Sequence, residues 1–124
     1  MSTITPTVTR FSQNAVRITY ANMAVDDVGV DIGKHWADFA DRSVQVTGTF
    51  GGNGSVTVEV SNDGGSTYHA ATDPQGNAVT KTGAATEQIV EAGALTRPHV
   101  TIGDANTAIH VDFYLRRDRS GQAA

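Results

Sequence analysis

Apolar and polar residues alternate along most of the chain with a period of two, and this pattern predicts half-buried β-strands. The clearest run covers residues 42–50, where every second residue from Val44 to Phe50 is apolar or glycine. After a stretch of glycine and asparagine at 51–54, residues 55–61 alternate again. Because Gly and Asn tolerate the positive φ of tight turns, we expect the two runs to form a β-hairpin.

Other segments repeat this pattern. Residues 16–20 and 109–115 alternate in the same way, and residues 86–90 do so more weakly. A shorter strand is predicted over 97–102, where Pro98 is expected to open the strand because proline cannot donate to the middle of a ladder. The turn residues 103–106 are predicted to connect this strand to the last one as a second hairpin.

Evidence for helices is thin. Residues 34–40 could form one turn with Trp36 and Phe39 on one side, and residues 84–94 contain helix formers among β signals. We expect at most a short helical turn in either place.

Closely spaced strands separated by turns are typical of an all-β domain. We predict a small antiparallel β-sandwich, Ig-like or jelly-roll-like, with a small barrel as the alternative. No repeat of 20 to 50 residues is present, which excludes a solenoid or a full propeller. The predicted organisation is an N-terminal arm at 1–14, a β-sandwich domain at 15–119 and a flexible tail at 120–124.

The first residues are rich in threonine and carry isolated apolar side chains, which indicates an extended arm. The unpaired backbone of such an arm could add to a sheet edge on a partner. The residues predicted to dock there are Ile4, Pro6, Val8, Arg10 and Phe11. The alternative is a disordered leader, because chain termini commonly fray.

Composition narrows the classes of partner. The chain has 124 residues and no cysteine, so it must fold without disulfides or thiolate zinc sites, as suits a reducing cytoplasm. A net charge of −4 argues against broad nucleic-acid binding. Arg116, Arg117 and Arg119 form a local basic cluster that we interpret as a solvated tail. No apolar run approaches a membrane span and no Sec signal pattern opens the chain, so we expect synthesis in the cytoplasm and no membrane partner.

No arrangement of residues typical of an enzyme is evident. The four histidines, His35, His69, His99 and His110, lack the spacing of a metal site. The acidic pairs Asp26–Asp27 and Asp38–Asp41 are explained by turns, and no GxSxG serine motif is present. We therefore predict a protein that is not an enzyme and that needs no cofactor and no metal.

The most specific local pattern lies at 61–68. It resembles the Asp-box, S-x-D-x-G-x-T followed by an aromatic residue, which is a structural turn in sialidase propellers. The residues that match are Ser61, Asp63, Gly65, Thr67 and Tyr68. Asp63 can accept backbone N–H groups across the turn, and the glycines supply positive φ. A calcium site is the alternative, although EF-hand spacing is missing. Residues 73–77, DPQGN, predict a second tight turn.

Three stretches together resemble a known class of proteins. They are DRSVQVTGTFGGNGSVTVEVSNDGGSTY (41–68), TDPQGNAVTKTGAATEQIVE (72–91) and RPHVTIGDANTAIHVDFYLRR (97–117). Their order is similar to that of small virion structural proteins of tailed bacteriophages, most like capsid decoration (cement) proteins. This resemblance implies a subunit made in the host cytoplasm that binds the major capsid protein on the outer surface of the virion head. It also implies a homo-oligomer, a trimer or dimer, that stabilises the shell.

Two other functions fit the same residues. One is another virion component, such as a tail or baseplate protein, and a tail-tube subunit would assemble into rings. The other is a non-catalytic carbohydrate-binding β-module, which usually displays exposed aromatic side chains. In the sequence only Trp36 and Tyr114 are expected to be available for such a platform.

Overall fold

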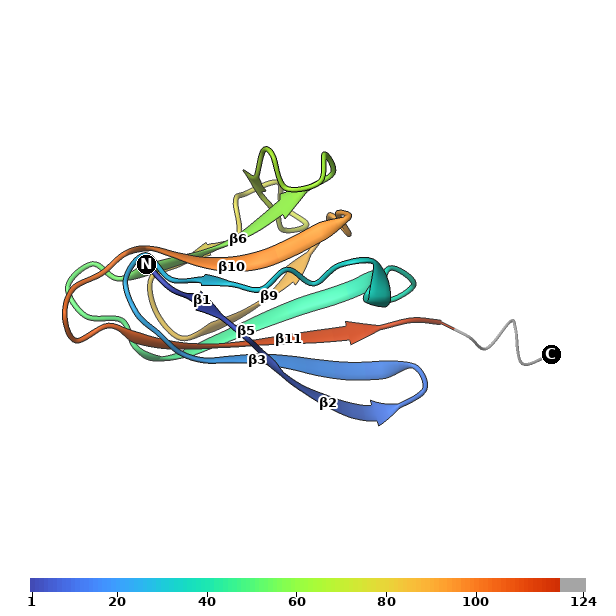
Figure 1. The fold of residues 1–124 in the computed structure, drawn as a ribbon, viewed down its shortest axis with the longest axis horizontal. Coiled ribbons are helices and arrows are strands. Elements are labelled where there is room, and N and C mark those ends of the chain that lie inside the picture. The colour runs from blue at the N-terminus through green and yellow to red at the C-terminus, as the bar shows by residue number, and fades with distance from the viewer. Residues whose placement is uncertain (119–124) are drawn as a thin grey trace.

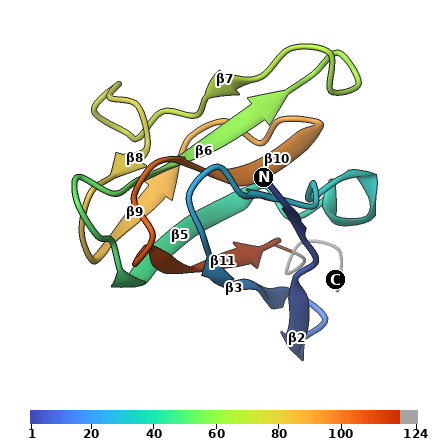
Figure 2. The ribbon, with the colours of Figure 1, turned by 60° about the vertical axis from the view of Figure 1, so that its left-hand side comes forward.

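The computed structural model describes residues 1–118, so the predicted tail at 120–124 lies outside the described part. Two β-sheets pack face to face, as Figures 1 and 2 show. Sheet A has the order β1 (Thr3–Ile4), β4 (Val28–Gly29), β10 (Leu95–Ile102), β6 (Ser55–Ser61) and β7 (His69–Ala70), and β8 (Thr80–Lys81) also pairs with β6. Sheet B has the order β2 (Thr7–Ser12), β3 (Ala15–Met23), β11 (Ala108–Arg116), β5 (Asp41–Thr49) and β9 (Ala85–Ile89).

Antiparallel pairing dominates both sheets. Only β1 and β4 run parallel among the paired strands of the described residues. The predicted all-β antiparallel sandwich is therefore confirmed. The strand at β9 confirms the weak signal at 86–90. The 3₁₀ turn η1 (Lys34–Trp36) is the short helical turn expected within 34–40.

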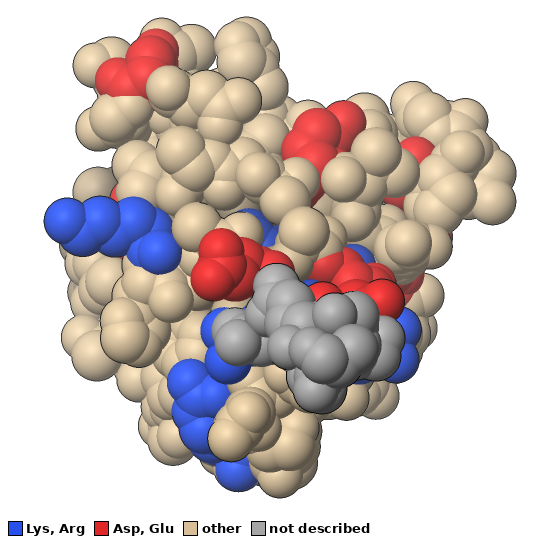
Figure 3. Space-filling view, turned by 90° about the vertical axis from the view of Figure 1, so that its right-hand side faces the viewer, with Lys and Arg blue, Asp and Glu red and all other residues tan. Residues whose placement is uncertain are grey.

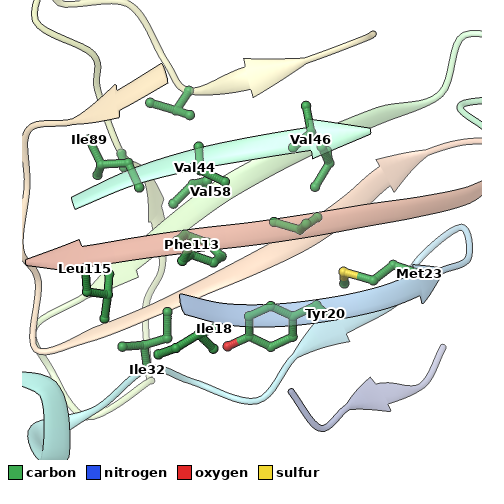
Figure 4. Packing of buried hydrophobic residues seen from close by; sticks show 14 of the residues in the cluster. Ile18, Tyr20, Met23, Ile32, Val44, Val46, Val58, Ile89, Phe113 and Leu115 are labelled. Atoms are coloured by element: carbon green, nitrogen blue, oxygen red, sulfur yellow. The ribbon is translucent and has the colours of Figure 1, made fainter. Parts of the chain in front are cut away.

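The core forms where the apolar faces of the two sheets meet. Every second residue of β3 and β11 points inward, and Val16, Ile18 and Phe113 are fully buried there. Figure 4 shows Ile18 and Phe113 packing among buried residues from both sheets. The ring of Tyr20 meets that of Phe113 edge to face at 5.9 Å. The alternation seen in the sequence thus reports which side of each strand is buried.

Both predicted hairpins are wrong, because the two strands of each pair belong to different sheets. Loop 50–54 takes the chain from β5 in sheet B to β6 in sheet A, and loop 103–107 takes it from β10 back to β11. Alternation and turn residues do not separate a hairpin from a sheet-crossing loop, because both leave apolar side chains facing one core. The two crossing loops lie at the same end of the molecule (Figure 1).

Pro98 lies inside β10 and does not open it. It stands opposite Val58 of β6, within a ladder that runs from Leu95 to Ile102. The other neighbour of β10 is β4, which has only two residues. A Cβ atom added to Gly29 of β4 would lie 2.7 Å from Cδ of Pro98. A short partner strand with a glycine beside the ring therefore accommodates the proline.

The structure also differs from the prediction of a separate arm at 1–14. β1 pairs with β4 in sheet A, and β2 pairs with β3 in sheet B, so the segment crosses from one sheet to the other near Pro6. Threonine and isolated apolar residues favour strands, and here they pair with the chain's own sheets. The sandwich therefore includes the first residues, and β2 is an edge strand of sheet B.

Candidate functional site

The outer face of sheet B presents two rows of side chains that the strand register sets side by side. In one row, Tyr114 of β11 stands opposite Arg17 of β3 and Ser43 of β5. In the next row, Asp112 stands opposite Thr19 and Gln45. Residues directly opposite on neighbouring strands have Cβ atoms about 5 Å apart. The register therefore builds a grid of polar groups around one tyrosine.

Phe11 of β2 also lies on this face. In the β2–β3 ladder Thr9 stands opposite Arg17, and Phe11 is two residues further along β2, so alternation places it on the same side. A register shift follows, because Arg10 stands opposite Val16 and Ser12 opposite Ala15. Here the ring of Phe11 lies 6.0 Å from that of Tyr114, at 45°. Phe11 is 55% exposed and Tyr114 is 39% exposed, so the two residues form a pair of exposed aromatic rings.

An open hollow of about 360 Å³ lies beside these rings. Phe11, Arg17, Gln45 and Tyr114 line it, together with other residues of β5, β9 and β11. The guanidinium of Arg17 lies 5.6 Å from the centroid of the Phe11 ring. This cation–π contact holds a positive charge at the rim of the hollow.

The carboxylate of Asp112 already has two partners. Its Oδ1 accepts a hydrogen bond from the Thr19 hydroxyl, and its Oδ2 lies 3.1 Å from Nε2 of His110. Within residues 1–118, the side chains of Arg17, Gln45 and Tyr114 have no hydrogen-bond partner. The hollow thus offers one unpaired cation, one amide and one phenol beside a carboxylate that is already satisfied.

The five predicted docking residues do not form one surface. Ile4 packs against the core, and Pro6 is half-buried. Arg10 stacks over the ring of Trp36 at 5.3 Å, and Phe11 lies on the outer face of sheet B. Val8 is 48% exposed on edge strand β2. Val8, Arg10 and Phe11 are therefore exposed, whereas Ile4 and Pro6 are partly buried.

The Asp-box-like turn closes the hairpin between β6 and β7 through a compact set of hydrogen bonds. Asp63 Oδ1 accepts from the Thr67 N–H at 3.0 Å and from the Ser61 hydroxyl at 2.8 Å. The Ser61 hydroxyl oxygen in turn accepts from the Gly65 N–H at 3.1 Å, and Gly65 has a φ of +93°. The Thr67 N–H and then the Ser61 hydroxyl lower the pKa of Asp63. These contacts support the predicted structural role of Ser61, Asp63, Gly65 and Thr67.

Tyr68 anchors this turn to sheet A. The guanidinium of Arg97 lies 3.6 Å from the centroid of the Tyr68 ring, and the Tyr68 hydroxyl donates to Asp31 Oδ2 at 2.8 Å. Burial, followed by the hydrogen bond to Asp31, raises the pKa of Tyr68. Arg97 also pairs with Glu59 at 2.9 Å, and Glu59 bonds His99 at 3.0 Å. Arg97, Glu59 and His99 are therefore engaged with one another beside this turn.

The remaining candidate residues are distributed over the fold. His35 lies on η1 and His69 on β7, whereas His99 and His110 pair with carboxylates on opposite sheets. No group of three or more metal-binding side chains converges within residues 1–118. The Asp27 carboxylate accepts the backbone N–H groups of Ser2 and Ala24, as a turn residue would. The 73–77 turn is confirmed, with Asp73 Oδ1 accepting from the Gln75 and Asn77 N–H groups.

Two arginines of the basic cluster at the C-terminal end contact the rest of the protein, unlike the solvated tail that was predicted. Arg116 pairs with Asp41, and Arg117 donates to the Gln13 carbonyl at 2.9 Å while lying 4.6 Å from the Phe39 ring centroid. Arg119 lies outside the described residues. Figure 3 shows that positive and negative side chains are mixed at this end of the molecule. No helix among the described residues is long and apolar enough to cross a membrane.

Two features of the structure were not predicted from the sequence. The first is Phe11 beside Tyr114, because residues 1–14 were predicted to form a separate arm and the two rings are far apart in the sequence. The second is Arg42, which is only 2% exposed and donates to the carbonyls of Trp36 and Phe39. The sequence pattern does indicate that Arg42 is buried, because it lies two residues before Val44 and therefore on the apolar face of the predicted strand.

Comparison with known proteins assigns no family to the chain. No protein-family model matches the chain, and no curated protein matches its sequence. Among solved structures, one described as the structure of KdgF from Halomonas sp. is similar over 91% of this chain and 78% of that chain, with 8% sequence identity and a TM-score of 0.41. A likeness of this size says nothing about what the chain does.

Proposed function

We propose that this chain is a bacteriophage capsid decoration protein that binds the outer surface of the major capsid protein shell and stabilises the head. The resemblance of residues 41–117 to small virion proteins suggests this function, and a rigid all-β sandwich suits a subunit that acts by binding and not by catalysis. The proposal places the protein on the virion after synthesis in the host cytoplasm.

The observation that carries the proposal is the free edge of β2. Within residues 1–118, β2 pairs with β3 on one side and with no strand on the other. Val8 is exposed on this edge strand. An unprotected edge strand can accept an extended segment of another protein through backbone hydrogen bonds. In this proposal a segment of the capsid protein adds to β2 and contacts Val8.

Charge and copy number support the same role. A net charge of −4 keeps free copies apart in solution and gives no general attraction for packaged DNA. A homo-oligomer, dimeric or trimeric, would engage several capsid subunits at once. Linked contacts of modest strength then hold firmly because each additional contact is intramolecular.

The test uses heads of the phage that encodes the chain, prepared without it. Purified protein should co-sediment with these heads and raise the temperature at which they release DNA. Val8→Asp should weaken binding at least tenfold because it places a charge at the proposed contact. Val90→Asp is the matched control, since Val90 is 54% exposed beyond β9 at the opposite edge of sheet B.

Failure of the unmodified protein to bind heads, or equal binding by Val8→Asp and its control, would overturn this mode of attachment. Electron microscopy of the purified protein addresses the tail-protein alternative. Rings or tubes formed by the protein alone would favour a tail-tube subunit, whereas small discrete oligomers favour decoration.

A further inference from the structure

We propose that the outer face of sheet B binds an acidic oligosaccharide in the hollow between Phe11, Tyr114, Arg17 and Gln45. This site is separate from the β2 backbone edge that the proposed function uses. It goes beyond that function, and either proposal can fail without the other. The inference depends on three features of the hollow: its paired rings, its unpaired polar groups and its free positive charge.

The paired rings provide a surface for stacking. Phe11 and Tyr114 are among the few large apolar side chains that are exposed within residues 1–118, and their centroids lie 6.0 Å apart. Aromatic side chains offer large, rigid contact area with little loss of conformational freedom. The C–H face of a sugar ring fits such a surface, and its edge carries hydroxyl groups that need partners. Two neighbouring rings suit a chain of sugars better than a single one.

Unpaired polar groups surround these rings at regular spacing. The amide of Gln45 and the hydroxyls of Ser43, Thr86 and Tyr114 have no hydrogen-bond partner among the described residues. The register places Tyr114 opposite Ser43 and Gln45 opposite Thr86, so these groups follow the strand spacing of about 5 Å. Amide and hydroxyl groups both donate and accept, as recognition of sugar hydroxyls requires.

The free charge selects an acidic ligand. Arg17 stacks on Phe11 and has no carboxylate within ion-pair distance in residues 1–118. The nearest acidic member of the hollow, Asp112, is already bonded to Thr19 and His110. A guanidinium presents a fork of N–H donors that matches a carboxylate. A sugar acid stacked on the rings could therefore place its carboxylate against Arg17.

A glycan array that carries matched neutral and uronic-acid oligosaccharides tests this assignment. The purified chain should bind acidic members, and calorimetry with the best of them gives the dissociation constant. Tyr114→Ala and Gln45→Ala should each weaken binding at least tenfold. Arg17→Gln should abolish the preference for acidic over neutral sugars while circular dichroism shows an unchanged fold.

Two controls separate this site from general effects. Ile102→Ala truncates another apolar side chain, 53% exposed at the end of β10, and should leave sugar binding unchanged. Val8→Asp should also leave it unchanged, because it alters only the proposed capsid contact. Binding to no sugar, equal binding to neutral and acidic sugars, or full binding by Tyr114→Ala would overturn the inference. None of these results bears on attachment to heads.

Discussion

The carboxylate of Asp104 accepts a hydrogen bond from the backbone N–H of Gly52 at 2.7 Å, and this contact joins the two loops in which the chain crosses between its sheets. A second contact lies beside it, where the Thr107 hydroxyl donates to the Phe50 carbonyl at 2.9 Å and accepts from the Asp104 N–H at 2.8 Å. The ends of β5 and β10 are therefore held together by side chains, and not by a hairpin ladder.

Removing the Thr107 hydroxyl should lower stability without changing the shape of the side chain. Thr107→Val leaves the partly buried Phe50 carbonyl and the Asp104 N–H without their partner, and we expect a loss of about 1–2 kcal/mol in the free energy of unfolding. Urea denaturation followed by circular dichroism measures this loss. Thr101→Val, at an exposed strand position, should change stability by less than about 0.5 kcal/mol. Equal midpoints for both variants would contradict the role of the loop contact.

Acid should destabilise the protein through three carboxyl groups that accept hydrogen bonds. Backbone N–H groups of Thr67 and Gly52 lower the pKa values of Asp63 and Asp104, and the Thr72 hydroxyl lowers that of Glu91. In the unfolded chain these pKa values return to about 4, so the unfolded state binds protons more readily. The stabilisation is complete above roughly pH 5.5, where the unfolded chain has also released these protons, and it is lost as the pH falls through the lowered values.

Urea unfolding at a series of pH values from neutral to strongly acidic checks this dependence. Asp104→Asn removes one of the three titrating groups, so the stability of this variant should depend less steeply on pH in the acid range. Asp38→Asn changes an exposed carboxyl outside these hydrogen bonds and should leave the slope unchanged. A flat profile in the unmodified protein would refute the argument.

The sequence allowed the strands to be predicted but not the way they are joined. Alternation located β3, β5, β6 and β11, because burial of one face leaves a period of two. It could not show that 51–54 and 103–106 cross between sheets, because the choice depends on which distant strand pairs with each edge. Asp104, which bonds Gly52 across 52 positions, provides a contact that no local pattern contains.

The candidate sites follow the same division. The Asp-box-like turn could be predicted because its hydrogen bonds, such as the one from Thr67 to Asp63, connect residues only four positions apart. The aromatic pair could not be predicted, because Phe11 and Tyr114 are far apart in the sequence and only the pairing of β2 with β3 brings them to one face. Trp36, expected to be available to ligands, is instead covered by Arg10 and Phe39.

Arg42 should be essential to the packing of η1 against the sandwich. Its buried guanidinium donates to the carbonyls of Phe39 and Trp36 and to the Thr96 hydroxyl oxygen, and burial lowers its pKa. Arg42→Met leaves these acceptors without donors, and we expect a loss of about 3 kcal/mol in stability. Because Trp36 is the single tryptophan, its fluorescence should also shift to the red in the folded variant.

Two further variants identify the cause of that change. Arg42→Lys keeps the charge but cannot reach all three acceptors from one ammonium group, so it should also be destabilised. Lys34→Met alters an exposed cation of the same turn and should change stability by less than about 0.5 kcal/mol. Unchanged tryptophan emission and stability in both Arg42 variants would show that the hydrogen bonds are dispensable.

Gly29 should not tolerate even one added methyl group. A Cβ atom there would overlap the ring of Tyr20 and lie 2.7 Å from Cδ of Pro98, and both neighbours are buried. Gly29→Ala should therefore cost about 1–3 kcal/mol of stability through overpacking between β4 and β10.

Gly83→Ala is the matched control, because no atom lies within 4 Å of its Cβ position and its φ is not in the left-handed region. That variant should be neutral or slightly stabilised, by up to about 1 kcal/mol, because alanine restricts the unfolded chain. Thermal unfolding of the two variants side by side measures the difference. Equal melting temperatures would mean that β4 can move away from Pro98, and that the close approach of Gly29 is not what accommodates a proline within β10.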